Sequence, residues 1–382
     1  MGGNLLDYIG NLSTPTASVN TEKCFLGSVI STPKARSLIA DIKHFYLNDH
    51  LPETEYLKLH ISAIPDEIIA AYNLQTLQDE KGWCYIKLSK GMYGLKQAGI
   101  IANQELEQHM SAYGYRPVQF TPGLWEHENK ETIFSLVVDE FLAQYSSEMD
   151  AENLLHALRQ KYTITVNRKS KKYIGINLKW DYSKHTVELS MSEYVKNALH
   201  KFQHLLPCRP EHSPYVQNAP IYGRSIQYSD PEDSSDLLSP SNCNLIQQIL
   251  GTFLYYGIAL DNYLLVALND ISLEQYKATD NTSKKISKLL NYLATHPEAV
   301  IKYHASGLQL YVLSDSSYLS VSKSRSRAGG IHYLSDPPTN TQDPDNYTPL
   351  LHGIIYVVPK ILCNIMSSAA EAELGALFLN GK

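Results

Sequence analysis

The 382-residue sequence predicts an α+β protein from strand patterns that alternate with helical patterns. Residues 133–145 contain two apolar runs rich in β-branched and aromatic side chains, separated by adjacent acids, which is the pattern of a β-hairpin with acids at its tip. Residues 84–89 alternate between apolar and polar side chains, as a strand does. Residues 100–113 and 151–162 carry apolar side chains at helical spacing.

The acids at the predicted hairpin tip, Asp139 and Glu140, allow two interpretations. Acids in a tight turn are commonly solvated and have no chemical role. Against this, the tip contains no Asn-Gly, Asp-Gly or Pro, and apolar neighbours such as Val138 and Phe141 crowd the carboxylates. Carboxylates held rigidly between buried strands suit hard divalent cations. The pattern therefore predicts a candidate metal site.

The composition is that of a soluble globular protein, with 43% hydrophobic and 19% charged residues, and the length allows two or three domains. The longest apolar stretches, such as residues 353–358, are far shorter than the roughly 18 residues of a membrane span. The first twenty residues show no secretory signal. The five cysteines are far apart with no CxxC pair, which predicts reduced thiols in an intracellular protein and no zinc site. The pattern does not distinguish cytoplasm from nucleus.

The net charge of −6 hides a strong segregation along the chain. Residues 1–154 carry 11 Lys and Arg against 20 Asp and Glu, whereas residues 155–202 carry 10 against 3. The centre of this basic block contains Lys169, Lys171 and Lys172, which suit contacts with a phosphate backbone. A solvated hairpin loop is the alternative interpretation of the same residues.

The first half of the chain is expected to begin with an irregular polar segment over residues 1–36. A short apolar strand then runs into Asp41 and continues through an aromatic pair to Leu47. A strand over residues 56–60 precedes a helix that begins at Pro65, where proline is favourable. A compact turn over residues 90–99 holds two glycines around Tyr93, which permit close approach of the backbone.

The second half is expected to begin with a hairpin of two strands, residues 172–180 and 186–190, and a short helix over 192–202. Residues 206–242 are rich in Pro, Ser, Asp and Asn, which indicates a linker or an extended arm. An amphipathic helix over 245–256, capped by Ser241 or Asn242, is expected to bury one face that its apolar residues share. These are Leu245, Ile246, Ile249, Leu250, Phe253 and Leu254.

The last part of the chain is expected to hold a further helix and then a small sheet. The helix covers residues 283–295. Strands over 308–315, 328–334 and 353–358 follow it, and a capping-box pattern at Ser368 and Glu371 starts the final helix.

Three of these patterns together resemble the reverse transcriptase of copia-type long-terminal-repeat retrotransposons. They are the segment 41–46, the turn 93–98 and the segment 137–140, and their order and spacing match the three central polymerase motifs of that family. The resemblance implies a right-hand polymerase palm with partial fingers and a thumb. It implies RNA-directed DNA synthesis on an RNA or DNA template-primer with deoxynucleoside triphosphates, and other retroelement proteins as further partners.

The resemblance also assigns residues to the chemistry. Asp41, Asp139 and Glu140 are expected to bind two Mg²⁺ or Mn²⁺ ions, one activating the primer 3′-hydroxyl and one steadying the leaving pyrophosphate. Tyr46 resembles the steric gate against a ribose 2′-hydroxyl, with a core aromatic as the alternative. Gln97 resembles the glutamine that touches the incoming nucleotide, with a helix cap or surface residue as the alternative.

Glu140 departs from the family pattern, which has Asp-Asp at the hairpin tip. The added methylene extends the carboxylate by one bond, about 1.5 Å. Because a misplacement of about 1 Å can lower a rate on the order of 100-fold, we expect an impaired polymerase.

Downstream segments resemble other parts of the same polyprotein. The hairpin around Gly175 resembles the primer grip, and the helix over 245–256 resembles part of the thumb. The strands after residue 307 resemble the first half of a ribonuclease H-like α/β domain, with Asp315 and Glu373 as its first two metal ligands and Glu371 as a helix cap. Since that domain needs two further carboxylates, ribonuclease H activity is not expected.

The resemblance predicts four domains. Partial fingers and palm occupy residues 1–205, linker and thumb 206–262, a connection 263–307 and a truncated ribonuclease H-like domain 308–382. The short ends and Glu140 suggest a fragment of an element, so two alternatives stay open. One is a catalytically silent relic that at most binds nucleic acid, and the other is a misfolding reading frame with an exposed half-sheet.

Overall fold

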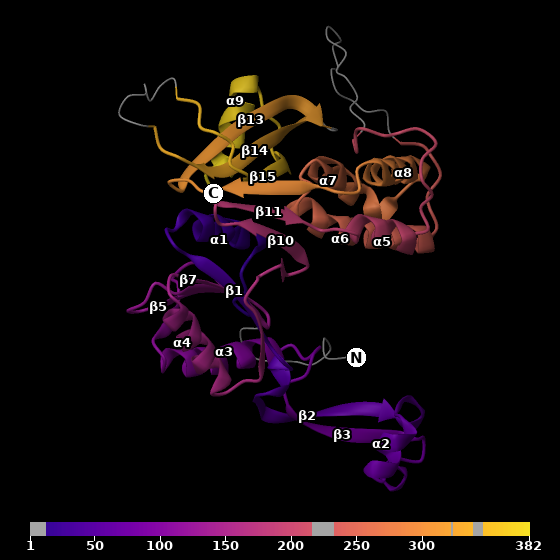
Figure 1. Ribbon diagram of the computed structural model, residues 1–382. Helices are drawn as coiled ribbons and strands as arrows, with labels where there is room; N and C mark the ends of the chain where they lie inside the picture. The colour runs from indigo at the N-terminus through magenta and orange to yellow at the C-terminus, as the bar shows by residue number, and fades with distance from the viewer. Residues whose placement is uncertain (1–12, 216–232, 322–323, 339–346) are drawn as a thin grey trace. The chain divides into compact units, whose positions relative to one another are not determined.

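The computed structural model describes residues 13–215, 233–321, 324–338 and 347–382 (Figure 1). The chain divides into two compact units. The first comprises Met1–Ser18 and Ser37–Lys169, and the second Val19–Arg36 and Ser170–Lys382. The boundary after Lys169 falls inside the first predicted domain, 1–205, and the four predicted domains stay a prediction.

A six-stranded sheet in the order β4-β5-β6-β7-β1-β8 forms the centre of the first unit. The predicted hairpin is present, because β6 and β7 pair antiparallel with Val137 opposite Glu140. The strands are β1 (Arg36–Ile42), β4 (Tyr115–Pro117), β5 (Leu124–His127), β6 (Ile133–Val137), β7 (Glu140–Tyr145) and β8 (Ile164–Asn167).

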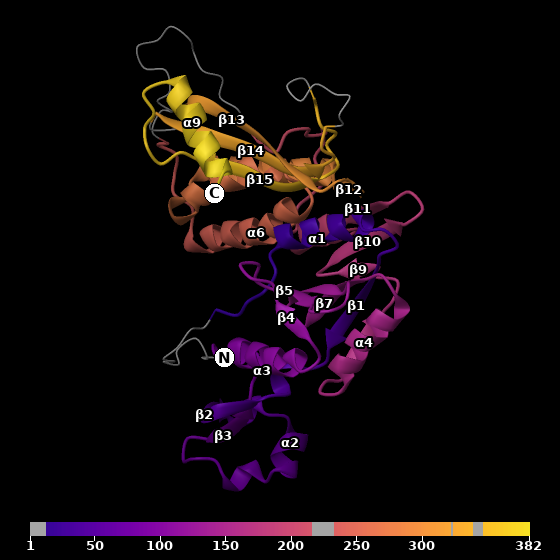
Figure 2. The same cartoon turned by 90° about the vertical axis from the view of Figure 1, so that its left-hand side faces the viewer.

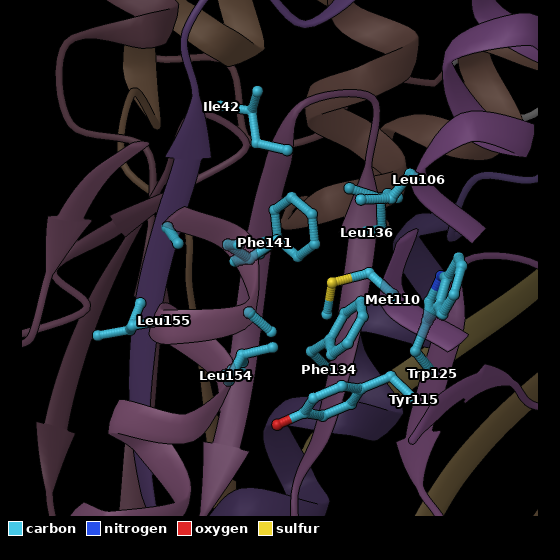
Figure 3. Close-up of a cluster of buried hydrophobic side chains, with 14 of the residues drawn as sticks. Ile42, Leu106, Met110, Tyr115, Trp125, Phe134, Leu136, Phe141, Leu154 and Leu155 are labelled. Atoms are coloured by element: carbon cyan, nitrogen blue, oxygen red, sulfur yellow. The ribbon is translucent and has the colours of Figure 1, made fainter. Parts of the chain in front are cut away.

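Helices α3 (Ala98–Ser111) and α4 (Glu148–Arg159) pack on this sheet and share one hydrophobic core with it (Figure 3). From the helices come Leu106 and Met110 of α3 and the leucines of α4, and from the sheet come Phe134 and Phe141. Because successive strand side chains point to opposite faces, the residues between these core positions lie on the other face of the sheet. That second face carries the candidate site.

A smaller part of the first unit consists of the two-stranded sheet β2 (His50–His60) and β3 (Trp83–Lys90) with the short helix α2 (Asp66–Ala71). Its own small core contains Ile64, Ile69, Leu74 and Cys84. The strand and the helix after Pro65 that the sequence predicts here are both present.

The second unit contains a four-stranded sheet in the order β12-β11-β10-β9 and most of the helices. The strands are β9 (Lys172–Tyr173), β10 (Ile176–Asp181), β11 (Thr186–Ser190) and β12 (Val300–His304). The helices are α1 (Val19–Ser31), α5 (Tyr194–Lys201), α6 (Pro240–Ala259), α7 (Leu264–Glu274) and α8 (Asp280–Thr295). In the described residues no helix is both long enough and apolar enough to cross a membrane.

The same unit ends in a three-stranded antiparallel sheet with β14 (Arg325–Ser335) between β13 (Gln309–Val321) and β15 (Ile354–Ile361). The last helix, α9 (Ala369–Asn380), packs on β13 and β14 (Figure 2). Ser368 caps α9 as predicted, because its side chain accepts a hydrogen bond from the Glu371 N–H. The Glu371 carboxylate accepts from the Ser367 N–H at 2.6 Å.

Helix α1 corrects the prediction of an irregular amino-terminal segment. Phe25, Leu26, Val29 and Ile30 form one buried helical face inside an otherwise polar sequence. The adjacent Lys23 is also buried and donates to the Ile258 carbonyl at 2.6 Å, and burial lowers its pKa to about 8. Because polar residues of this helix are buried together with its apolar ones, the composition of the segment did not indicate a helix.

The predicted single strand over residues 172–180 is also wrong, because the chain reverses in its middle. Ile174 and Gly175 both have positive φ and connect β9 to β10 as a two-residue hairpin turn. A Cβ at Gly175 would meet only ordinary van der Waals contact with Met191. Gly175 therefore supplies a backbone conformation here.

Helix α6 differs from its prediction at its start and on its surface. Ser239 is the N-cap and Pro240 the first helical residue, which replaces the predicted cap at Ser241 or Asn242. Ile246, Ile249, Leu250 and Phe253 are buried as expected. Leu245 and Leu254 instead are 42% and 47% exposed, since they flank the buried stripe.

Candidate active site

Asp41 is the sixth residue of β1 and lies on the face of the sheet opposite the helices. Its neighbours Ala40 and Ile42 point into the core, so alternation directs the Asp41 side chain to the other face. Thr165 lies opposite Asp41 in β8 and donates its hydroxyl to Asp41 Oδ2 at 3.4 Å. The carboxylate is thus held at the end of a central strand.

Asp139 lies in the two-residue turn of the β6–β7 hairpin. Val138, the other turn residue, has φ +60°, and Asp139 does not have a positive φ. This is the pattern of a type II′ turn, whose first central residue is usually Gly. The Asp139 carbonyl accepts a hydrogen bond from the Ile42 N–H at 2.9 Å, which ties the turn to the end of β1.

The two aspartates lie close enough to interact electrostatically. Burial, and then the nearby charge of Asp41, raise the pKa of Asp139 above its ordinary value. A hydrogen bond from the Tyr93 hydroxyl to Asp139 Oδ2, at 3.5 Å, opposes this shift. Two carboxylates that repel each other in this way favour a bound cation.

Tyr46 and Tyr93 form an aromatic pair beside the aspartates. Their ring centroids are 4.8 Å apart in an edge-on arrangement. Burial and the charge of Asp139 raise the pKa of both phenols. Tyr46 packs against the core at its edge, whereas its neighbour Phe45 is the fully buried aromatic. Tyr46 therefore lies next to the acids and is only partly a core residue.

Gly91 allows the turn that carries Tyr93 to approach the backbone of Tyr46. A Cβ on Gly91 would lie in collision with the Tyr46 carbonyl oxygen, so no other residue fits without a shift. This confirms the predicted close approach at the first glycine. Gly94 has φ +97° and open space around it, so it serves backbone conformation instead.

Gln97 is buried at the start of α3, with only 5% of its surface exposed. Its amide nitrogen donates to Glu55 Oε1 of β2 at 2.8 Å. Gln97 occupies the N-cap position but makes no capping hydrogen bond. In this structure its contact is with Glu55, and a contact with a nucleotide stays a prediction.

Glu140 is the first residue of β7 and follows Asp139 directly. Its partner across the hairpin is Val137. Phe141 points into the core, so the Glu140 side chain lies on the face that also carries Asp41. In the part of the chain that the structure describes, no three His, Cys, Asp or Glu side chains gather into a metal-binding group. Mg²⁺ needs only one or two carboxylates when substrate phosphates and water complete its shell, and the Asp41–Asp139 pair fits this requirement.

The other predicted site residues lie outside this cluster. Gly175 is in the turn between β9 and β10. Lys169, Lys171 and Lys172 are exposed, and Lys169 ends the first unit. Arg168, in the same basic segment, forms ion pairs with Glu148 and Glu152.

The Ser316 N–H donates to Glu373, 57 positions further along the chain, and so brings Asp315 and Glu373 together. The Ser316 N–H lies 2.9 Å from Asp315 Oδ1 and 3.3 Å from Glu373 Oε1. These hydrogen bonds join β13 to α9. Their role as metal ligands stays a prediction.

Two residues near the aspartates were not predicted from the sequence as site residues. Tyr93 contacts Asp139, and Thr165 contacts Asp41. Tyr93 lies between the two glycines of the turn. These glycines, which permit an unusual backbone conformation, were the sequence feature that could have indicated Tyr93. No sequence pattern indicated Thr165, since it lies next to Asp41 only because β8 pairs with β1.

We predict that Val138→Gly stabilises the protein. A β-branched residue at positive φ stores strain of about 1–3 kcal/mol, and part of this gain is offset by the greater freedom of Gly in the unfolded chain. We expect an increase of about 1 kcal/mol in the free energy of unfolding, measured by urea denaturation. Val137→Gly, one residue earlier in β6, should instead destabilise. A loss of stability in both variants would contradict the strained turn.

We predict that Asp139→Asn stabilises the metal-free protein at neutral pH. Because the folded-state pKa of Asp139 is raised, the folded protein binds the extra proton, and stability falls as pH rises from the unfolded value of about 3.9 through the folded value. The melting temperature of the variant should be higher than that of the native protein at neutral pH. In acid the two melting temperatures should become equal. Added Mg²⁺ should reduce this difference in melting temperature, because it stabilises only the native protein.

Asp181→Asn is the matched control for this prediction. Hydrogen bonds from Ser183 and Lys184 lower the pKa of Asp181, so its removal should destabilise the protein at neutral pH. An Asp139→Asn variant that melts at or below the native temperature at neutral pH would show that the charge of Asp139 is not unfavourable.

Comparisons with known proteins identify the family of this chain. A family model described as reverse transcriptase (RNA-dependent DNA polymerase) matches residues 12–217, more than half of the chain. Among solved structures, apo telomerase from Candida tropicalis truncated from its C-terminal domain is 12% identical with a TM-score of 0.23, covering 41% of this chain and 36% of that chain. Telomerase from Candida albicans in complex with a TWJ fragment of telomeric RNA is 11% identical with a TM-score of 0.29, covering 76% and 51%.

This chain therefore spans between about a third and about a half of those two telomerase chains, 36% and 51%. The family match covers the segment that holds Asp41, Tyr93 and Asp139. The chain belongs to the reverse transcriptase (RNA-dependent DNA polymerase) family.

Proposed function

We propose that this chain is the reverse transcriptase of a copia-type long-terminal-repeat retrotransposon. It extends a primer on an RNA or DNA template from deoxynucleoside triphosphates. The observation that carries the proposal is that three segments far apart in sequence meet around two aspartates. The end of β1, the turn before α3 and the β6–β7 turn are joined there by the contacts of Ile42 and Tyr93 with Asp139.

The proposed architecture assigns the six-stranded sheet with α3 and α4 to the palm, and β2, β3 and α2 to partial fingers. Helix α6 belongs to the thumb and α8 to the connection. The sheet β13–β15 with α9 is the first half of a ribonuclease H-like domain, with Asp315 and Glu373 as its acidic pair. The domain limits are those predicted from the sequence.

Asp41 and Asp139 are the proposed ligands of Mg²⁺ or Mn²⁺, with Glu140 as a third carboxylate. Bound there, the metals would activate the primer 3′-hydroxyl and steady the leaving pyrophosphate. The chain itself orients the two aspartates, through the Thr165 hydroxyl on Asp41 and the Tyr93 hydroxyl on Asp139. The longer Glu140 side chain displaces one carboxylate and lowers the rate.

Tyr46 is the proposed gate against a ribose 2′-hydroxyl. Its ring is held edge-on by Tyr93, and Gly91 fits against its backbone, so its position next to Asp139 is constrained on two sides. Gln97 is proposed to contact the nucleotide only after it releases Glu55. The hairpin around Gly175 is the proposed primer grip.

We predict Mg²⁺- or Mn²⁺-dependent primer extension by the purified chain, and its loss in Asp139→Ala. Glu140→Asp should raise the rate by up to about 100-fold, because it moves the carboxylate back by about one bond length. Gel analysis of a labelled primer on RNA template measures both effects.

Glu131→Ala is the matched control, because Glu131 is an exposed acid in the loop before β6. It should extend primers like the native chain. Extension that persists in Asp139→Ala would refute the site. If neither the native chain nor Glu140→Asp extends primers, the result would favour the alternative function.

The alternative is a silent relic that only binds nucleic acid. Lys169, Lys171 and Lys172 favour it, because they are exposed and form no ion pair within the described residues. Arg168 contributes less, since two glutamates already offset its charge. Such binding would read no sequence, because phosphate contacts carry none.

For this alternative we predict that replacing the three lysines by Gln weakens duplex binding and flattens its salt dependence. The slope of log affinity against log salt should fall by about 0.9 for each lost phosphate contact. Fluorescence anisotropy over a range of salt concentrations measures the slope. Lys179→Gln is the control, since Lys179 is already paired with Glu188 at 2.9 Å. An unchanged slope in the triple variant would show that the block is a solvated face.

A further inference from the structure

The small sheet of β2 and β3 has one apolar face and one face that combines aromatic rings with lysines. Leu59, Cys84 and Ile86 belong to the small core together with Ile69 of α2. Side chains alternate along a strand, and residues opposite each other in a pair share a face, so the residues between these core positions lie on the other face. We call them the ring–lysine face, and they are Tyr56, Lys58 and His60 of β2 and Trp83, Tyr85 and Lys87 of β3.

Each cross-strand pair of the ring–lysine face combines an aromatic ring with a lysine or a histidine. The pairs are Tyr56–Lys87, Lys58–Tyr85 and His60–Trp83. The Lys58 ammonium lies 4.8 Å from the ring centroid of Trp83 and 5.5 Å from that of Tyr85. The rings of His60 and Trp83 meet edge-on, with their centroids 5.3 Å apart. Rings and positive charges therefore alternate across the face.

The ring–lysine face has exposed rings and no acid of its own. Tyr56 and Tyr85 are 64% and 59% exposed, and Lys58 and Lys87 are exposed as well. Neither lysine forms an ion pair within the residues that the structure describes. The acid next to Tyr56 in β2, Glu55, lies on the opposite face, where it accepts a hydrogen bond from Gln97. The face therefore presents two positive charges beside exposed aromatic rings.

A covering segment of protein does not suit this face, whether it comes from this chain or from another. Such a segment would bury the ammonium groups of Lys58 and Lys87 together with the rings. Burial of a charged group without a partner is strongly unfavourable. The occupant that fits carries negative charges and flat groups that stack on the rings. An acidic peptide supplies the charges but lacks regularly spaced flat groups.

We propose that the ring–lysine face binds single-stranded nucleic acid, DNA or RNA. The bases stack on Tyr56, Trp83 and Tyr85, and the phosphates contact Lys58 and Lys87. Stacking on aromatic side chains combined with positive charge along the backbone is the general mode of binding single strands without reading their sequence. The face selects single strands, because the bases of a duplex stack on one another and are not free to stack on protein rings.

The spacing of the rings fits this ligand. Trp83 and Tyr85 are two residues apart on β3, so their Cβ atoms are separated by about 7 Å. A base stacked on each ring places the phosphate that joins the two nucleotides between the rings. The Lys58 ammonium already lies next to both rings and can pair with that phosphate. This binding uses neither a metal ion nor the two aspartates, so it does not depend on polymerase activity.

Fluorescence anisotropy of the full chain with short labelled oligo(dT) and oligo(rU) tests the proposal. We expect Tyr85→Leu to weaken binding about tenfold or more, because it removes one stacking ring and keeps an apolar side chain. Lys87→Gln should lower the slope of log affinity against log salt by about 0.7. Tyr72→Leu is the matched control and should bind like the native chain. Tyr72 is 70% exposed and follows α2, which packs on the opposite face of the sheet.

Tryptophan fluorescence supplies a second measurement. A base that stacks on Trp83 should quench its emission when either oligonucleotide is added. Trp83→Phe should still bind but lose this quenching, because phenylalanine keeps an aromatic ring. Trp83→Leu should lose both the quenching and part of the affinity, by a factor similar to that of Tyr85→Leu.

Two further variants separate this face from the sites proposed above. Asp139→Ala, and the triple Gln variant of Lys169, Lys171 and Lys172, should both keep their affinity for single strands, whether or not the chain extends primers. Loss of single-strand binding in the triple variant would assign the binding to that basic block and overturn the proposal. A native chain that does not bind single strands, or binding that Tyr85→Leu leaves unchanged, also overturns it.

Competition identifies the class of ligand. Unlabelled oligo(dT) should displace the labelled strand, whereas a duplex of the same length and polyglutamate should displace it poorly. Equal displacement by the duplex would show that the bases do not stack on the rings. Equal displacement by polyglutamate would show that the face recognises negative charge alone, as it would if an acidic protein segment were its ligand, and would overturn the proposal.

Discussion

The candidate site depends on the alternation of side chains across the six-stranded sheet. One face of β1, β6 and β7 packs on α3 and α4, and the other face carries Asp41 and Glu140. A shift of one residue in any of these strands would bury the acids in the core and expose the core residues. The dense packing of Phe134, Phe141 and the leucines of α4 therefore sets the register that places the carboxylates.

The hydrogen bond from the Ile42 N–H to the Asp139 carbonyl couples this register to the chemistry. It joins the end of β1 to the hairpin turn, and so brings together acids that are almost a hundred residues apart. The arrangement carries two costs, the positive φ of Val138 and the mutual repulsion of Asp41 and Asp139. Backbone strain and perturbed carboxylates of this kind are typical of functional sites.

The helices of the two units differ in which side chains they bury and which they expose. In the first unit α3 and α4 have an apolar face toward the sheet and a polar face outward. In the second unit α1 buries Lys23 together with apolar residues, and α9 presents small residues to its sheet and large apolar ones outward. The burial of Lys23 explains why composition alone misjudged α1.

The sequence alone determined much of the local structure and the identity of the acids. The β6–β7 hairpin, α3, α4 and the cap of α9 follow from local periodicity and turn chemistry. So does the place of Asp139 at a hairpin tip. Their causes lie within a few residues of each other, so a linear pattern is enough to predict them.

The tertiary structure decided which side chains meet. The contacts of Tyr93 with Asp139, Thr165 with Asp41 and Gln97 with Glu55 join residues 46, 124 and 42 positions apart. The break at Gly175 and the buried Lys23 also depend on neighbours that no local pattern contains. Such contacts follow from strand order and core packing, which are properties of the whole chain, and the sequence by itself does not display them.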